Sequence, residues 1–248
     1  MSGMLRVGTS GFAYPDWAPA FYPPGVRGED LLRSYSERLN ACELNNTFYR
    51  QPSETAVAGW LARTPGSFRF AVKAQRGGSV RALIGDDQAE SVGWLTRPLA
   101  GFGARLGCVL YRVPHGIGRT DERHERLARL LALWPAAFSL TLEFQDPSWQ
   151  VDETFALMRR HRAVLCATDL DDPDEPPVIR VTGPYLYLRL RRTDYSEADL
   201  DAWAARISPF LEAGIDVYVF FRHDETGISP NRAMSLAELV AGSPRDRG

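Results

Sequence analysis

The sequence predicts a single-domain TIM-type (β/α)8 barrel, and three observations lead to that class. Eight strand-like apolar runs alternate with about seven helical periodicities, which is the pattern of successive parallel βα units. The length of 248 residues suits one barrel of this kind. No linker or low-complexity block divides the chain, so residues 1–248 are treated as one domain. A doubly wound open sheet is the alternative architecture.

The expected strands are runs rich in β-branched, aromatic and other apolar residues. They cover Leu5–Ser10, Ala41–Asn46, Phe68–Ala74, Leu106–Val113, Phe138–Gln145, Ala163–Asp169, Tyr185–Arg191 and Asp216–Arg222. The connection from Leu170 to Pro184 is rich in proline and acid, so we expect no helix there, with room for a short extra strand at Val178–Val181.

The expected helices show apolar residues at three- and four-residue spacing. They cover Glu29–Leu39, Ser53–Arg63, Asp86–Leu99, Asp121–Trp134, Val151–His161, Ser196–Leu211 and Asn231–Val240. Ser53 and Ser196 are expected to cap two of these helices, the latter together with Asp199 three residues further on. The tail at 242–248 is expected to fray.

The composition is that of a soluble globular protein, with 44% apolar and 24% charged residues. The sequence contains neither a long apolar run nor a signal-peptide pattern, so we expect a cytoplasmic protein with no membrane partner. Cys42, Cys108 and Cys166 each lie in a separate apolar run, which predicts buried thiols rather than disulfides or a zinc site. The net charge of −2 gives no general attraction to nucleic acid, and the oligomeric state is open.

Lysine is almost absent from the chain. Of its 29 basic residues 28 are arginine, and Lys73 is the one lysine. An ammonium group can lose its proton when it is desolvated, whereas a guanidinium group effectively cannot. Lys73 is therefore a candidate for acid–base or Schiff-base chemistry. The alternative is a chance survivor of compositional drift that pairs with Glu43 or Glu143.

Alternation along parallel strands predicts which side chains enter the barrel. One set packs under the helices and is apolar, while the other points inward, and its uppermost layer lines the mouth of the active site. In the sixth strand this rule places Cys166 and Thr168 outward. Applied to six strands, it gathers a polar set at one rim: Glu43, Asn45, Lys73, Glu143, Asp169, Arg189 and Arg222. The alternative is a buried ion-pair network that only fills the barrel.

Aromatic residues close to the same strand ends are candidates for stacking on a sugar or base. They are Tyr14, Trp17, Tyr49 and Trp149. Plugging the top of the barrel is the alternative role.

Six segments resemble one known family in the same order. They read VGTSGFAYPDWAPAFYPPG, ELNNTFYRQP, FRFAVKA, LGCVLYRVP, LEFQDPSW and DVYVFFRHD, the last followed by GISPNRAMSL. Over nearly its entire length the chain resembles the YecE-like family, catalogued as domain of unknown function 72. The resemblance implies a TIM-type barrel and no settled reaction.

The family pattern matches at some of the candidate positions and departs at others. Those that match are Glu43, Asn45, Lys73, Glu143 and Arg189. The chain departs from the pattern at Gln145, Arg191 and His223, which leaves open whether the family's activity is altered or abolished here.

These observations favour an enzyme that acts on a small polar or anionic substrate, with its reaction class (hydrolase, lyase or isomerase) open. Lys73, Glu43 and Glu143 are the expected catalytic groups. Substrate binding is expected from Asn45, Asp169, Arg189, Arg222, Tyr14, Trp17, Tyr49 and Trp149. One alternative is a nucleic-acid-binding, nuclease-like phosphodiesterase, and another is a non-catalytic ligand-binding protein. No metal ligand is assigned, because no metal-binding motif occurs, although a divalent cation on the carboxylates is a weaker alternative.

Overall fold

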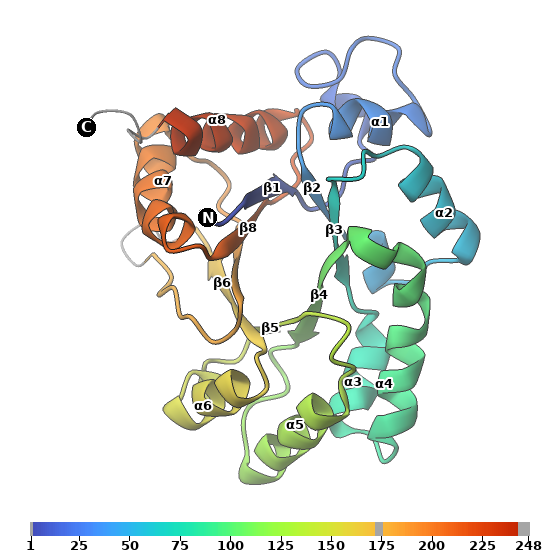
Figure 1. The fold of residues 1–248 in the computed structure, drawn as a ribbon, viewed down its shortest axis with the longest axis vertical. Helices are drawn as coiled ribbons and strands as arrows, with labels where there is room; N and C mark the ends of the chain where they lie inside the picture. The colour runs from blue at the N-terminus through green and yellow to red at the C-terminus, as the bar shows by residue number, and fades with distance from the viewer. Residues whose placement is uncertain (1, 172–175, 243–248) are drawn as a thin grey trace.

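Parallel strands form the centre of the molecule and helices surround them (Figure 1). The structure is a computed structural model that describes residues 2–171 and 176–242. Across these residues an eight-stranded sheet runs in the order β1-β8-β7-β6-β5-β4-β3-β2. The strands are β1 (Leu5–Thr9), β2 (Ala41–Leu44), β3 (Arg69–Lys73), β4 (Leu106–Val113), β5 (Leu140–Phe144), β6 (Val164–Asp169), β7 (Tyr185–Leu190) and β8 (Asp216–Phe221). The predicted TIM-type barrel is confirmed.

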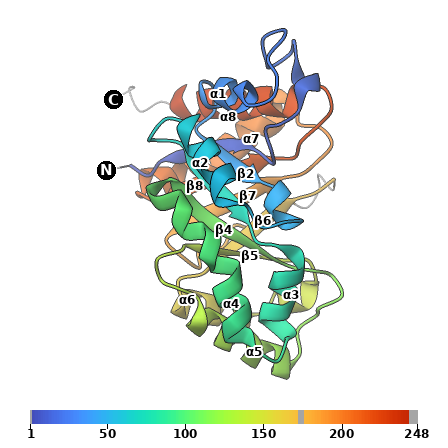
Figure 2. The same ribbon diagram turned by 90° about the vertical axis from the view of Figure 1, so that its right-hand side faces the viewer.

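The helices lie outside the strands, with α1 and α8 at one end of the molecule and α5 at the other (Figure 2). They are α1 (Asp30–Ser36), α2 (Glu54–Ala62), α3 (Arg76–Ile84), α4 (Gln88–Thr96), α5 (Asp121–Leu133), α6 (Asp152–Arg160), α7 (Glu197–Glu212) and α8 (Ile228–Gly242). Short 3-10 turns occur at η1 (Pro15–Trp17), η2 (Asn46–Phe48), η3 (Arg97–Arg105) and η4 (Pro147–Trp149). Both expected serine caps form, since Ser53 accepts from Ala56 N–H and Ser196 makes a capping box with Asp199.

Helix α3 is the element that the sequence pattern misses. It contains two adjacent glycines, which disfavour helix. Packing explains one of them, because a Cβ on Gly78 would lie 2.6 Å from the Trp94 ring and 2.7 Å from Leu95. The contact between α3 and α4 therefore requires glycine at position 78, although glycine lowers the helical propensity of α3.

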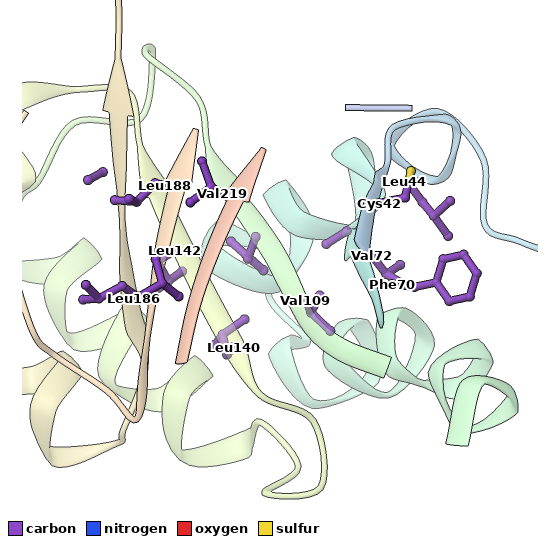
Figure 3. Packing of buried hydrophobic residues seen from close by; sticks show 14 of the residues in the cluster. Cys42, Leu44, Phe70, Val72, Val109, Leu140, Leu142, Leu186, Leu188 and Val219 are labelled. Atoms are coloured by element: carbon purple, nitrogen blue, oxygen red, sulfur yellow. The ribbon is translucent and has the colours of Figure 1, made fainter. Parts of the chain in front are cut away.

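The side chains of the strands form two shells. The outer shell, between strands and helices, is apolar, and Figure 3 shows part of it, including Leu44 and Phe70. The inner shell fills the barrel and consists of Ala41, Ala71, Cys108, Leu110, Val164, Cys166, Tyr185, Tyr187, Tyr218 and Phe220. Small residues on β2 and β3 face aromatic residues on β7 and β8, so the interior is packed below the charged layer. All three cysteines are buried and free, as expected.

In β6 the alternation is opposite to the prediction. Val164 and Cys166 belong to the inner shell, and the hydroxyl of Thr168 donates to Glu143 Oε1 at 3.1 Å. The carboxylate of Asp169 consequently points outward, away from the barrel mouth. The sequence misleads here because both alternating sets of this strand are mostly apolar or small.

Strands β1 and β2 close the barrel without a regular backbone ladder. A single parallel bridge joins Ser10 to Glu43. Nearer the amino ends of the strands, the Asn40 side chain joins them instead, because its Oδ1 accepts from Val7 N–H at 2.9 Å and its Nδ2 donates to Leu5 O at 2.9 Å. An amide side chain thus supplies the donor and the acceptor that a neighbouring strand would otherwise provide.

A tyrosine hydroxyl joins the same two strands halfway along. Tyr35 Oη accepts from Thr9 N–H at 2.7 Å and lies 3.1 Å from Ala41 O. The strands approach closely here, since a Cβ on Gly8 would lie 1.9 Å from Ala41 O. Only glycine allows this approach.

Two further expectations concern the connection between β6 and β7 and the C-terminal tail. The described part of the connection between β6 and β7 contains no helix, but the extra strand at Val178–Val181 is also absent there, and Val178 is exposed. Apart from Gly242, which ends α8, the tail expected to fray lies outside the described residues.

No helix in the described part of the chain has the length and apolar character needed to span a membrane.

Candidate functional site

A buried arginine between two carboxylates forms the centre of the charged layer. Arg189, 1% exposed, donates from Nε and Nη2 to the two oxygens of Glu43, at 3.0 and 2.8 Å. Its Nη1 donates to Glu143 Oε1 at 2.8 Å. These residues end β7, β2 and β5, so alternation along three strands brings them together as predicted. We call Glu43, Arg189 and Glu143 the paired centre.

Glu43 has a partner for every lone-pair direction that a carboxylate commonly uses. Besides Arg189 it accepts from Ser10 Oγ at 2.6 Å and from Tyr187 Oη at 2.8 Å. Burial alone would raise its pKa, but Arg189, Lys73 and the bond from Ser10 outweigh burial and lower the pKa to about 2. Glu43 is therefore ionised at neutral pH and held by its neighbours, which suits a positioning residue.

Glu143 is held less completely. Arg112 Nε lies 3.0 Å from Glu143 Oε2, yet the N–H is not aimed at that oxygen, and neither atom makes a hydrogen bond to another described residue. Burial would raise the pKa of Glu143, but Arg189 and Arg112 lower it overall. Glu143 is thus an ionised carboxylate whose Oε1 accepts from Arg189 and whose Oε2 faces Arg112 without a directed hydrogen bond.

Lys73 lies beside the paired centre and is not part of it. It is 7% exposed at the end of β3, and its Nζ makes a long hydrogen bond of 3.4 Å to Asn45 Oδ1. The ring of Phe48, in the turn after β2, lies 4.3 Å from Nζ. Among the described residues the amine forms no ion pair, because Arg189 occupies both nearby carboxylates.

The environment of Lys73 brings its pKa towards neutrality. Burial is the largest cause, and the positive charges of Arg189 and Arg112 act in the same direction. Glu43 and Glu143 oppose them, and the pKa falls to about 8. Because burial and neighbouring cations both disfavour the ammonium form, a fraction of Lys73 is a neutral amine near physiological pH.

Two arginines beside the paired centre differ in their partners. Nη1 of Arg191 is buried and has no hydrogen-bond partner among the described residues. Nε of Arg112 makes no directed hydrogen bond, but it lies 3.0 Å from Glu143 Oε2 in an ion pair. Burial, followed by the charge of Arg189, lowers the pKa of Arg191. We call Lys73 and Arg191 the unpaired cations. Orphaned buried donors of this kind fit an anionic ligand.

Arg112 and Arg191 were not among the predicted site residues. For Arg112 the signal was present, because Val109, Tyr111 and Val113 of β4 belong to the outer shell and leave residue 112 inward. Arg191 was noted as a departure from the family pattern, without a role. Its importance depends on an unpaired nitrogen, which only coordinates reveal.

The aromatic candidates divide into two pairs. Tyr14 is half-buried and stacks on His223 with ring centroids 5.1 Å apart, and Tyr49 is 78% exposed. Burial is the main cause that raises the pKa of Tyr14 to about 12, while the charge of Arg191 opposes the rise. The ligand-stacking roles of Tyr14 and Tyr49 stay predictions.

Trp17 and Trp149 are both 0% exposed, so the prediction that they stack on a ligand is wrong. The indole N–H of Trp17 donates to Asp224 O at 2.7 Å, and that of Trp149 donates to Ile117 O at 2.7 Å. Both rings belong to the apolar cluster between strands and helices, and each N–H has the partner that a buried indole needs.

Three further candidates have different surroundings. Asp169 accepts from Tyr195 Oη at 2.9 Å and from Trp203 Nε1 at 3.2 Å, so it joins β6 to the α7 region and lies outside the site. Arg222 is exposed at the end of β8, and its role in binding stays a prediction. Asn45 remains in the site through its contact with Lys73.

The described residues contain no group of three or more His, Cys, Asp and Glu side chains arranged to hold a metal ion. Glu43 and Glu143, the two carboxylates of the site, pair with Arg189 instead. Within the described residues, these carboxylates therefore do not form a metal site.

A parallel barrel whose strand ends carry a buried charged cluster defines the class as a TIM-type barrel protein. The chain belongs to the family described as protein of unknown function DUF72, whose family model matches residues 6–247. This membership confirms the resemblance drawn from the sequence.

Relatives extend over almost the whole chain. UPF0759 protein YunF of Bacillus subtilis (strain 168) is 23% identical, with 96% of this chain and 95% of the relative covered. A DUF72 family protein from Thermotoga maritima MSB8 is 26% identical with a TM-score of 0.84, over 96% of this chain and 99% of that one. A second, from Enterococcus faecalis V583, shows the same fold at 18% identity and a TM-score of 0.77, over 97% and 99%.

Proposed function

We propose that this chain is an enzyme that binds a small anionic substrate at the carboxyl ends of its strands and uses the amine of Lys73 as the reacting group. The observation that carries the proposal is a charge imbalance. Among the described residues the cluster contains Lys73, Arg112, Arg189 and Arg191 against Glu43 and Glu143. An anion would balance this excess of positive charge and satisfy the orphaned guanidinium N–H groups.

The proposal gives each of the predicted catalytic residues a separate role. Lys73 exchanges a proton with the substrate, because a pKa of about 8 leaves both of its forms accessible. Glu43 and Arg189 hold each other and fix the floor of the site. Glu143 orients Arg112, whose Nε lies 3.0 Å from Glu143 Oε2. Arg112 and Arg191, rather than Arg189, bind the anion.

The nuclease-like alternative has less support. Metal-dependent phosphodiesterases hold cations with carboxylates, whereas here both carboxylates are bound by a guanidinium group. A non-catalytic binding protein would not need a buried, unpaired amine, because burial of Lys73 disfavours its charge without a compensating ion pair.

Anion binding is tested first, with inorganic phosphate as the probe. Phosphate should raise the melting temperature of the wild-type protein, because a ligand that binds only the folded state stabilises it. Arg191→Met should weaken phosphate binding about tenfold in calorimetry, the effect of losing one charge-assisted hydrogen bond. Arg129→Met, a matched change on the exposed face of α5, should leave binding unchanged. Equal binding by all three proteins would overturn the anion site.

Turnover is tested with a panel of small carboxylates and phosphate monoesters, followed by proton NMR. The wild-type protein and Arg129→Met should consume at least one compound. Lys73→Arg should be slower by about 100-fold or more, because arginine keeps the charge but not the exchangeable proton. Consumption of no compound, or equal rates with Lys73→Arg, would overturn the enzymatic role and favour a binding protein.

A further inference from the structure

The amine of Lys73 is available to react as well as to exchange a proton. Its hydrogen bond to Asn45 is long, at 3.4 Å, and its contact with the Phe48 ring does not engage a lone pair. No carboxylate among the described residues is paired with it. A buried amine in these surroundings is the type of lysine that adds to carbonyl carbon, because only the neutral form carries a nucleophilic lone pair.

The groups around this amine restrict which carbonyl compounds would fit. Arg191 presents a buried N–H without a described partner. Arg112, whose Nε lies 3.0 Å from Glu143 Oε2, acts on Lys73 and on Arg191 by its charge. A compound held there needs a negative group for the guanidinium donors. Its carbonyl carbon must then reach the amine from the same side of the paired centre.

We propose that Lys73 captures an anionic aldehyde or ketone, such as a 2-oxo acid, as a covalent imine, with Arg112 and Arg191 holding its negative group. This inference rests on the proposed function, since it uses the same anion site. It adds the chemical class of the substrate and a covalent intermediate.

The step is balanced without any further reactant. The Nζ lone pair forms a bond to the carbonyl carbon, and one amine proton moves to the carbonyl oxygen to give a carbinolamine. The carbon–oxygen bond then breaks, and the oxygen leaves as water with the second amine proton. The products are an imine and one water molecule, with no change in oxidation state.

The composition makes the experiment unusually clear, because Lys73 is the chain's one lysine. The α-amino group is the other primary amine and serves as an internal reference for ordinary reactivity. Intact protein is incubated with glyoxylate and sodium cyanoborohydride, which reduces an imine to a stable secondary amine. Peptide mass spectrometry then assigns the adduct to Lys73 or to the α-amino group.

We expect glyoxylate to label Lys73 at least tenfold faster than the α-amino group at pH 8. Propionaldehyde, which is neutral, should show no such preference. Arg191→Met should remove most of the preference for glyoxylate, and Arg129→Met should retain it. Lys73→Arg should leave labelling only at the α-amino group.

The two proposals fail differently. If phosphate binds as predicted but glyoxylate labels only the α-amino group, the imine is overturned while the anion site stands. If glyoxylate and propionaldehyde label Lys73 equally, the role of the arginines in selecting the carbonyl compound is overturned. Failure of both phosphate binding and labelling of Lys73 overturns both proposals.

Discussion

The charged residues at the top of the barrel form two groups that differ in how completely their charges are matched. In the paired centre, Arg189 donates three hydrogen bonds to Glu43 and Glu143. The unpaired cations lie in the same layer, yet Lys73 has one long hydrogen bond, and Arg191 keeps a donor without a described partner. Burial of a charge and the matching of that charge are therefore separate properties, since Arg189 is at least as deeply buried as Lys73 and has both of its counterions.

The largest effect is expected from breaking the paired centre. Arg189→Met leaves Glu43 and Glu143 buried without their shared counterion, and losing one partner of a buried ion pair costs about 3–5 kcal/mol. Urea denaturation should show this loss in the free energy of unfolding. Arg129→Met is the control, and its effect should stay within about 0.5 kcal/mol. A small effect of Arg189→Met would mean that the centre is not the structural part of the site.

Replacing Lys73, unlike replacing Arg189, should raise the free energy of unfolding. The pKa of Lys73 falls from 10.5 to about 8, so the protonated form costs the folded protein about 3 kcal/mol. Lys73→Met removes that cost and should raise the free energy of unfolding at pH 7 by about this amount, and the melting temperature by several degrees. Lys73→Arg keeps the charge and should give no gain.

The gain from Lys73→Met should depend on pH in a defined window. The folded-state pKa lies below the unfolded value, so between about pH 8 and 10.5 the unfolded chain binds more protons and wild-type stability rises with pH. The gain is therefore full below pH 8 and declines towards pH 10.5. The charged groups that act on Lys73 are Glu43, Arg112, Glu143 and Arg189, which both proteins retain. If Lys73→Met raised the free energy of unfolding equally from about pH 8 to 10.5, the lowered pKa of Lys73 would be contradicted.

The smallest of the three effects concerns a single hydrogen bond to the paired centre. Ser10→Ala removes the donor that lies 2.6 Å from Glu43 Oε1, and a hydrogen bond to a charged group contributes about 1.5–3 kcal/mol. Ser79→Ala is a matched control, because Ser79 is also buried but donates to the neutral carbonyl of Gln75. Ser79→Ala should therefore lower the free energy of unfolding by less than Ser10→Ala does.

The loss of stability on Ser10→Ala should depend on pH. The bond from Ser10 helps to lower the pKa of Glu43 from 4.5 to about 2, so its contribution is present above pH 4.5 and is lost as the pH falls towards 2. Chemical denaturation across that range should show the deficit of Ser10→Ala shrinking. A deficit that does not change with pH would indicate that the serine acts through packing.

The sequence predicted the barrel and the paired centre because the relevant strands alternate clearly. In β7, leucines at 186, 188 and 190 leave Tyr187 and Arg189 inward, and the structure places them there. In β6 both sets are mostly small or apolar, and the partners of Asp169 lie 26 and 34 residues away, at Tyr195 and in α7. Local alternation contains no information about contacts of that range.

The sequence also did not predict which of the charged side chains pair with one another. Alternation gathers acidic and basic side chains at one rim, but it does not say which carboxylate Arg189 takes and which cation is left over. The burial of Trp17 likewise depends on Asp224, 207 residues away in the chain. Such contacts follow from the folded arrangement and are found only with coordinates.

The junction between β1 and β2 gives the paired centre a second task. Ser10 and Glu43 form the one backbone bridge between these strands within the described residues, and Gly11 N–H donates to Glu43 O at 2.8 Å beside it. Glu43 therefore fastens the barrel with its main chain and organises the charged layer with its carboxylate. Any motion that separates the two strands would also disturb the carboxylate that holds Arg189, so the closure of the barrel and the arrangement of the charged layer depend on the same residue.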